Sequence, residues 1–196
     1  MGAVGLCATD LPALSATKRS PQESARDRWM REWMDRWARI PHAPGATLHL
    51  SRFKDPMYFL LRPISWQPNP GQSSLARVEV PTGFVTDFAS IPRAFWSLLK
   101  PDGDYTYPAI VHDYLYWNQD ISKEDSDLIF MLAMEDFKIH SLTANTIYLA
   151  VKKFGQGAWD ENARLRASGE RRILREFSED PTITWQEWKV KPNVFL

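Results

Sequence analysis

A histidine and an aspartate lie side by side in the apolar stretch "AIVHDYLYWNQD", residues 109–120. On a helix the neighbours of His112 at four-residue spacing are Pro108 and Tyr116, so we expect both His112 and Asp113 to be at least partly buried. A buried charge requires a partner. The pair is therefore either a structural polar cluster that its neighbours satisfy, or part of a reaction centre in which His112 is the general base.

The partner of His112 is expected from the next helix, which follows the short loop "NQDIS" and should run antiparallel to the first. Its first turn carries Glu124, Asp125 and Asp127. One of these acids can hold the imidazole and fix which ring nitrogen carries the proton. Periodicity does not choose between Asp125 and Asp127, because residues 128–134 are apolar on all sides.

A further acid, Asp87, follows a predicted strand in "TDFASIPR". Asp87, Asp113 and one acid of the helix start would supply the oxygen ligands that calcium or magnesium prefers, and we expect no organic cofactor. Alternatively, Asp87 caps the turn and pairs with Arg93. Ser90 is a candidate nucleophile beside His112, although the G-x-S-x-G elbow of serine hydrolases is absent.

The elements that position these residues indicate an α+β fold. Residues 47–86 contain short alternating or apolar runs, "TLHLSRF", "MYFLLRPI", "ARVEVP" and "TGFVTDF", which predict a small antiparallel sheet. The sheet should pack against a mainly helical half, whose antiparallel helix pair carries the His–Asp motif. We expect helices over about 107–117, 123–138, 142–154 and 160–178.

The ends of the chain are expected to differ from this domain. Residues 1–20 predict a flexible arm, 45–178 a single α+β domain and 179–196 an extended tail. Residues 21–40 predict an amphipathic helix with Trp29, Trp33 and Trp37 at four-residue spacing. This helix either docks on its own domain or binds a protein partner or a membrane or cell-envelope surface.

Composition narrows the classes of function. The chain has 24 Lys and Arg and 24 Asp and Glu residues, which argues against binding nucleic acid mainly through phosphate contacts. Cys7 is the one cysteine, so no disulfide forms within the chain. The first twenty residues lack the pattern of a signal peptide, and no stretch of about eighteen apolar residues predicts a membrane span. We expect a soluble protein.

The ordered motifs "VPTGFVTDFASIPRAFW", "YPAIVHDYLY", "SKEDSDLIFMLAM" and "IYLAVKKFGQGAW" carry a resemblance over about residues 78–159. They resemble a phage- and prophage-associated family known only as domain of unknown function number 1353. The resemblance implies a phage or bacterial origin, and hence synthesis in the cytoplasm of a bacterial host. It implies no activity.

The order GF-x-x-DF, then H-D-x-x-Y-x-N, then an acid before an apolar helix is also similar to bacterial secreted phospholipases A2. This resemblance implies that His112 is the base that activates water and that Asp113 binds calcium. It implies that Asp127 orients the histidine, while Tyr116 and Asn118 complete the motif. The cysteines that flank the histidine in those enzymes are absent here, so the resemblance supports His–Asp hydrolase chemistry more than a lipid substrate.

These observations lead us to expect a hydrolase with a His–Asp centre, using a calcium-type ion on an ester or amide of lipid or cell-envelope material. One alternative is a non-enzymatic phage accessory or virion-associated binding module, in which the His–Asp pair is structural. A second alternative is an antibacterial toxin with the same hydrolytic chemistry.

Overall fold

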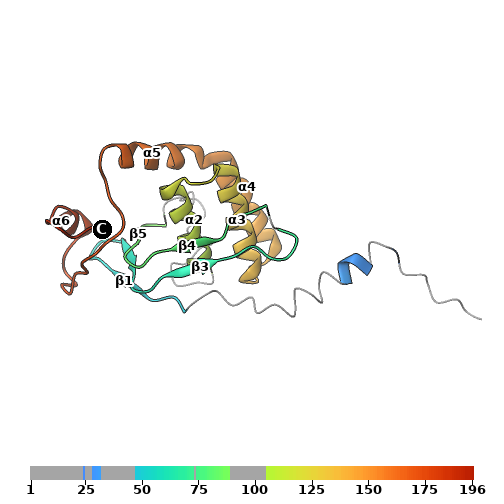
Figure 1. Ribbon diagram of the computed structural model, residues 1–196, viewed down its shortest axis with the longest axis horizontal. Coiled ribbons are helices and arrows are strands. Elements are labelled where there is room, and N and C mark those ends of the chain that lie inside the picture. The colour runs from blue at the N-terminus through green and yellow to red at the C-terminus, as the bar shows by residue number, and fades with distance from the viewer. Residues whose placement is uncertain (1–23, 25–27, 32–46, 73, 89–104) are drawn as a thin grey trace, which may run out of the picture. The chain divides into compact units, whose positions relative to one another are not determined.

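The computed structural model describes residues 24, 28–31, 47–72, 74–88 and 105–196 (Figure 1). The chain divides into two units, Met1–Arg39 and Ile40–Leu196. In the first unit residues 28–31 are helical, and the Trp29 side chain is exposed. The predicted arm and the rest of the tryptophan helix, Trp33 and Trp37 included, lie outside the described residues.

The second unit contains two small antiparallel sheets rather than the single sheet that the sequence predicts. The three-stranded sheet has the order β1-β2-β5, with β1 at Leu50–Arg52, β2 at Tyr58–Leu60 and β5 at Val85–Thr86. The other sheet pairs β3, Ile64–Trp66, with β4, Val78–Val80. Pro63 separates β2 from β3, and since proline has no N–H to donate, the ladder is interrupted there.

The helical half confirms the predicted α+β class. Its helices are α2 (Thr106–Asn118), α3 (Lys123–Asp136), α4 (Ser141–Phe154), α5 (Gln156–Ala167) and α6 (Trp185–Lys189). Helix α3 begins where Ser122 Oγ accepts a hydrogen bond of 3.0 Å from the Asp125 backbone N–H. No helix of the described residues is long and apolar enough to cross a membrane.

Helix α2 is the centre of this unit. It contacts α3, α5, β4 and β5, and all but two of its 13 residues are buried (Figure 1). Ile110 and Val111 pack in the core that includes Val80 of β4 and Ile129 of α3. A helix buried on all sides has no solvated face, so its polar side chains must find partners within the protein.

The predicted helix over 160–178 is corrected, because α5 ends at Ala167 and Gly169 follows with a φ of 92°. The chain then runs back along β5, with an antiparallel bridge between Phe84 and Ile173. Gly83 permits this approach. Its φ is 84°, and a side-chain carbon there would overlap the backbone of Leu174.

The sequence predicts an extended C-terminal tail over 179–196, but the structure has the short helix α6 within it. Thr184 and Glu187 form a capping box that starts α6, a signal that the T-x-x-E spacing carries in the sequence. Trp185 is buried against Phe53, with ring centroids 5.6 Å apart. The hydrophobic effect of covering this indole explains why the tail folds onto the sheet.

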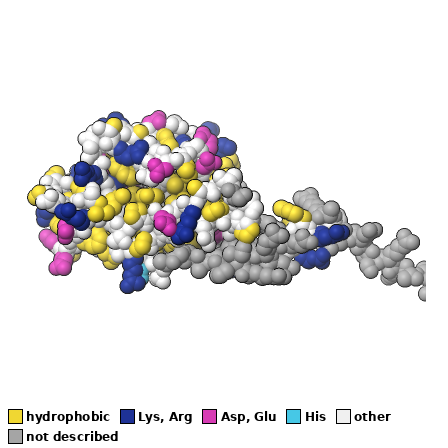
Figure 2. Space-filling model, in the orientation of Figure 1, with side chains coloured by type: hydrophobic (Ala, Val, Ile, Leu, Met, Phe, Trp, Pro, Cys, Tyr) yellow, Lys and Arg dark blue, Asp and Glu magenta, His cyan; other side chains and the backbone are white. Residues whose placement is uncertain are grey.

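Charged side chains are mixed on the surface of this unit. On the face drawn in Figure 2, Lys and Arg side chains lie beside Asp and Glu side chains, with neutral and hydrophobic groups between them. The described residues therefore form no continuous basic surface on this face. The expectation that the protein does not bind nucleic acid stays a prediction.

Candidate functional site

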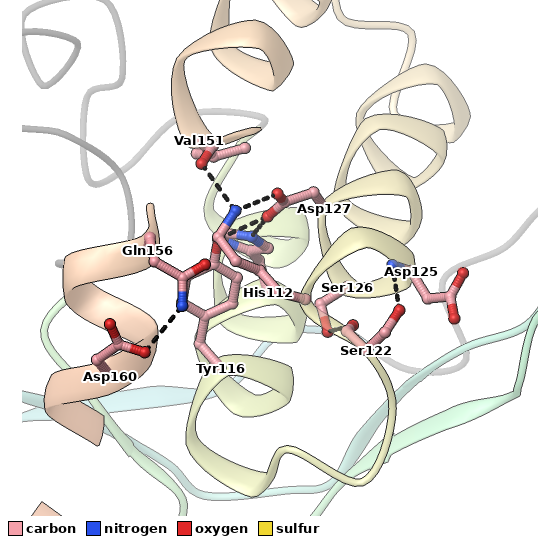
Figure 3. A network of polar contacts seen from close by, with 10 residues as sticks. His112, Tyr116, Ser122, Asp125, Ser126, Asp127, Val151, Gln156 and Asp160 are labelled. Atoms are coloured by element: carbon pink, nitrogen blue, oxygen red, sulfur yellow. Dashed lines mark hydrogen bonds and ion pairs between the residues drawn. The ribbon is translucent and has the colours of Figure 1, made fainter. Parts of the chain in front are cut away.

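The Asp127 carboxylate binds three side chains in the interior between α2 and α3 (Figure 3). Its Oδ1 lies 3.0 Å from His112 Nε2 and accepts a hydrogen bond of 2.6 Å from the Tyr116 hydroxyl. Its Oδ2 accepts a hydrogen bond of 2.7 Å from Lys123 Nζ. His112 and Tyr116 are one helical turn apart on α2, so both reach the same carboxylate of α3. We call these four residues the Asp127 network.

Aromatic rings pack against the His112 imidazole, in addition to the contact of its Nε2 with Asp127. The side chain is 0% exposed, and its ring stacks on Phe130 at a centroid distance of 4.4 Å. The Tyr116 ring lies 4.1 Å away. Because an ionised carboxylate can only accept, Nε2 donates a hydrogen bond to Asp127 Oδ1.

Lys123 compensates the charge of Asp127 inside the protein. Only 8% of its side chain is exposed, and its Nζ also donates to the carbonyl of Val151, at 3.1 Å. Val151 lies in the last turn of α4, where partial negative charge from the helix dipole favours a cation. The network thus joins α2, α3 and α4.

Gly155 makes room for the Tyr116 hydroxyl at the junction of α4 and α5. A side-chain carbon at Gly155 would overlap both Tyr116 Oη and the carbonyl oxygen of Val151. The φ of Gly155 is −74°, an ordinary helical value, so close packing rather than backbone conformation requires glycine here.

The pKa values of the network follow from these contacts. Burial raises the pKa of the Tyr116 hydroxyl far above its usual range, and the hydrogen bond to Asp127 raises it further, so this hydroxyl stays protonated and donates. Burial acts to raise the pKa of Asp127, but its hydrogen bonds with His112, Lys123 and Tyr116 outweigh burial and hold it below 3.8.

We expect the Asp127 carboxyl carbon, followed by NMR in the folded protein, to titrate with a midpoint below its ordinary pKa of 3.8. Because the unfolded chain binds this proton more readily, the stability that Asp127 contributes is present above pH 3.8 and is lost as the pH falls through the folded-state pKa. A midpoint above 3.8 would contradict the geometry described here.

A pocket lies beside the network, on another side of α2. Successive residues of a helix point about 100° apart, so Asp113 faces away from Asp127. The cavity has a volume of about 190 Å³. Its lining residues come from α2, α5 and the segments after β5 and α5: Asp87, Asp113, Ala158, Glu161, Asn162, Leu165 and Arg172.

Both signs of charge are present in this pocket. Thr86 Oγ1 donates to Asp113 Oδ2 in a short hydrogen bond. The Arg172 guanidinium lies 4.6 Å from the centroid of the Trp117 ring, and its Nε is 3.4 Å from Glu170 Oε1. The pocket is thus neither purely acidic nor purely basic.

The structure brings His112, Tyr116 and Asp127 together and resolves the open choice between Asp125 and Asp127 as the partner of His112. It corrects the expectation that Asp87 and Asp113 converge with Asp127, because those two aspartates line the pocket instead. Among the described residues, no three His, Cys, Asp or Glu side chains are arranged to hold a metal ion.

The remaining predicted site residues are Asn118, Ser90 and Arg93, none of which is a member of the Asp127 network as described. Asn118 ends α2, where its side chain donates to Asp120 and its carbonyl accepts from Arg166. Ser90 and Arg93 lie outside the described residues, so their predicted roles stay predictions.

Sequence reasoning missed three contributors. Lys123 lies four residues before Asp127, and this i,i+4 spacing of opposite charges is a signal that identifies it as a partner. Gly155 has no local signal, because its role depends on a tyrosine of another helix. Arg172 has none either, since it reaches the pocket through pairing between residues 83–85 and 172–174.

Comparison with known proteins places part of the chain in context. Residues 65–151 match the family described as "Protein of unknown function (DUF1353)", which confirms that predicted resemblance over this region. "Uncharacterized protein y4jT" of Sinorhizobium fredii is 32% identical over 78 residues, which are 39% of this chain and 23% of that protein. The chain thus covers less than a quarter of this relative's length. No solved structure matches.

The matched region contains the whole Asp127 network but only part of the pocket. It contains all four residues of the Asp127 network and ends at Val151, whose carbonyl accepts from Lys123. It contains Asp87 and Asp113 of the pocket, but not the pocket residues of α5, nor Arg172. A phage origin and a likeness to phospholipase A2 stay predictions.

Proposed function

We propose that this protein is a hydrolase in which His112 is the general base and Asp127 orients it. The observation that carries the proposal is the contact of 3.0 Å between His112 Nε2 and Asp127 Oδ1, in a carboxylate that Tyr116 and Lys123 also hold. Fixing one nitrogen of an imidazole against a carboxylate is the arrangement that prepares the other nitrogen to accept a proton.

The reaction that this geometry supports is hydrolysis of an ester or amide. Water attacks the carbonyl carbon and gives a proton to the imidazole of His112, while the carbonyl electron pair moves to oxygen. When the tetrahedral intermediate collapses, the bond to the leaving oxygen or nitrogen breaks, and the imidazolium returns the proton to that atom. Asp127 stabilises the imidazolium between these two steps.

The substrate class that we propose is an ester or amide of lipid or cell-envelope material. Asp113, the residue that follows His112, lines a pocket of about 190 Å³ in which a polar part of such a molecule would fit. Asp87 and Asp113 carry the hard oxygen donors that calcium prefers, but the described residues hold no three-ligand group. No step is therefore assigned to an ion.

A second candidate is a non-enzymatic binding module in which the Asp127 network is structural. The complete burial of His112 favours this candidate, since a base must meet its substrate and a structural histidine need not. Both oxygens of Asp127 also have partners within the protein.

Replacing His112 by glutamine separates these candidates. A glutamine amide can donate to Asp127 but cannot accept a proton, so we expect the rate of hydrolysis to fall by roughly 10²–10⁴-fold with the fold retained. The measurement is hydrolysis of 4-nitrophenyl esters, phospholipid vesicles and purified cell-wall sacculi, each with calcium or with EDTA. His140→Gln, at an exposed histidine, is the control and should keep full activity.

Activity that His112→Gln leaves unchanged would overturn the role of His112 as the base. Absence of hydrolysis across all three substrates, in both calcium and EDTA, would favour the binding module.

A further inference from the structure

Helix α4 is apolar on two opposite sides. Its buried side, which includes Ile147 and Val151, packs in a core with Phe130 of α3. Leu142 and Leu149 lie on the other side, where 71% and 62% of their side chains are exposed. At 100° per residue these two leucines are only about 20° apart around the helix axis, and Leu149 points about 160° away from Val151. A surface helix usually places polar side chains opposite its buried side, so the second apolar side requires an explanation.

The polar side chains between the two leucines already donate to their own helix. Asn145 Nδ2 donates to the carbonyl of Ser141 at 2.9 Å, and Thr146 Oγ1 donates to the carbonyl of Leu142 at 2.7 Å. Such local hydrogen bonds remain in place when water is removed from the surface. An apolar medium can therefore cover this side of α4 without leaving these two donors unpaired.

The end of α4 is positively charged. Lys152 and Lys153 are exposed in its last turn, and residues 141–154 contain no Asp or Glu. The Nζ atoms lie 5.7 Å from the centroid of the Tyr148 ring and 5.2 Å from that of the Phe154 ring, respectively. Neither ammonium forms an ion pair with a group in the described part of the chain, so both charges are available to a partner.

The kind of partner follows from this combination of side chains. We call Leu142, Leu149, Lys152, Lys153 and Phe154, which is 63% exposed, the α4 face. Lysines in a last turn suit the helix dipole, but the dipole does not explain exposed leucines. Apolar side chains beside lysines are the pattern of helices that lie in a membrane interface, where the lysine stems follow the apolar groups and the ammonium groups meet the headgroups. An anionic lipid surface complements the positive charge.

We propose that the α4 face docks on an anionic lipid bilayer, with Leu142 and Leu149 below the headgroups and the two lysines among the lipid phosphates. On the inner side of the same helix, the carbonyl of Val151 accepts from Lys123. The docked bilayer therefore lies about one helix diameter, roughly 10 Å, from the Asp127 network. This inference goes beyond the proposed hydrolase and does not depend on it, because membrane binding requires no reaction.

Co-sedimentation of the full chain with lipid vesicles tests the proposal. The probes are vesicles of phosphatidylcholine alone and vesicles of an equal mixture of phosphatidylcholine and phosphatidylglycerol. We expect binding to the mixed vesicles to be at least about tenfold tighter, since each lysine contributes to attraction by an anionic surface. Added salt should weaken this binding, because salt screens exposed charges.

Two double variants separate the apolar from the electrostatic contribution. Leu142→Ser with Leu149→Ser should weaken binding to the mixed vesicles by at least about tenfold, because it removes the apolar area that the bilayer covers. Lys152→Glu with Lys153→Glu should abolish the preference for the mixed vesicles. All four side chains are exposed, so the variants should keep the parent's thermal unfolding midpoint.

Matched controls change the same kinds of side chain elsewhere on the surface. Val190→Ser with Leu196→Ser replaces two side chains that are 77% and 70% exposed. Arg171→Glu with Lys191→Glu reverses two exposed charges outside α4. Both controls should bind the mixed vesicles as the parent protein does.

Equal binding to both kinds of vesicle, or no binding to either, would overturn the proposal. Unchanged binding in the leucine double variant would also overturn it and would place the membrane contact elsewhere on the chain. Sedimentation velocity without vesicles tests the other occupant. Self-association of the parent chain that the leucine double variant abolishes would show that a second copy covers the α4 face, and the lipid assignment would be wrong.

Discussion

Replacing Asp127 by asparagine should lower the free energy of unfolding by about 3–5 kcal/mol, because the change leaves the Lys123 ammonium buried without a carboxylate. The asparagine oxygen can still accept from His112 or Tyr116. Its amide nitrogen, however, is a donor and cannot accept from Lys123. A domain of this size is stable by about 5–15 kcal/mol, so the loss is a large fraction of the total. Urea denaturation followed by tryptophan fluorescence measures it.

The matched control is Asp125→Asn, at an exposed carboxylate two residues away in the same turn of α3. It should change the stability by less than about 1 kcal/mol. Adding Lys123→Met to Asp127→Asn removes the stranded charge and should recover part of the loss. The Asp127 network would have no special role in stability if Asp127→Asn cost no more than its control.

Replacing Gly155 by alanine should lower the free energy of unfolding by about 1–3 kcal/mol, because the added methyl group overlaps Tyr116 Oη and the Val151 carbonyl. The hydroxyl must then move from Asp127, or α4 must shift from α5. The expected result is therefore a loss of stability together with a shifted NMR signal from the His112 ring. Urea denaturation and the imidazole proton spectrum measure the two effects.

The control for this change lies two residues away. A side-chain carbon at Gly157 in α5 would meet nothing within 4 Å. Alanine is favoured over glycine in a helix, so Gly157→Ala should raise the stability by about 0.5–1 kcal/mol. Opposite signs at the two glycines would isolate packing from helix propensity. The same sign at both would refute the packing argument.

Local patterns predict the parts of this fold that depend on local physics. The alternation in residues 47–86 predicts strands because side chains of a strand alternate between its faces, and Val78–Val80 alternates as expected. Helix α3 begins at Lys123 as the predicted range 123–138 has it, and the cap at Ser122 depends only on residues three apart. The meeting of His112 with an acid of α3 follows from two helices joined by a short loop.

The rest of the site depends on contacts between segments far apart in the sequence. In the sequence Asp87 and Asp127 each lie next to an apolar segment. The hydrophobic periodicity does not predict that Asp87 lines the pocket while Asp127 belongs to the network. The helix predicted over 160–178 includes Arg172, whereas Gly83 and Gly169 let its segment lie along β5 instead. Such tertiary pairing overrides local helix propensity.

The family match ends at Val151, so the Asp127 network lies within the match and the α5 wall of the pocket lies beyond it. A relative that keeps the Asp127 network inherits the same oriented imidazole, whatever follows it. The pocket residues of α5 and Arg172 lie beyond the match, whereas Asp87 and Asp113 lie within it. Exchange of the segment beyond the match between relatives would therefore replace the α5 wall of the pocket while leaving the buried histidine and its carboxylate untouched.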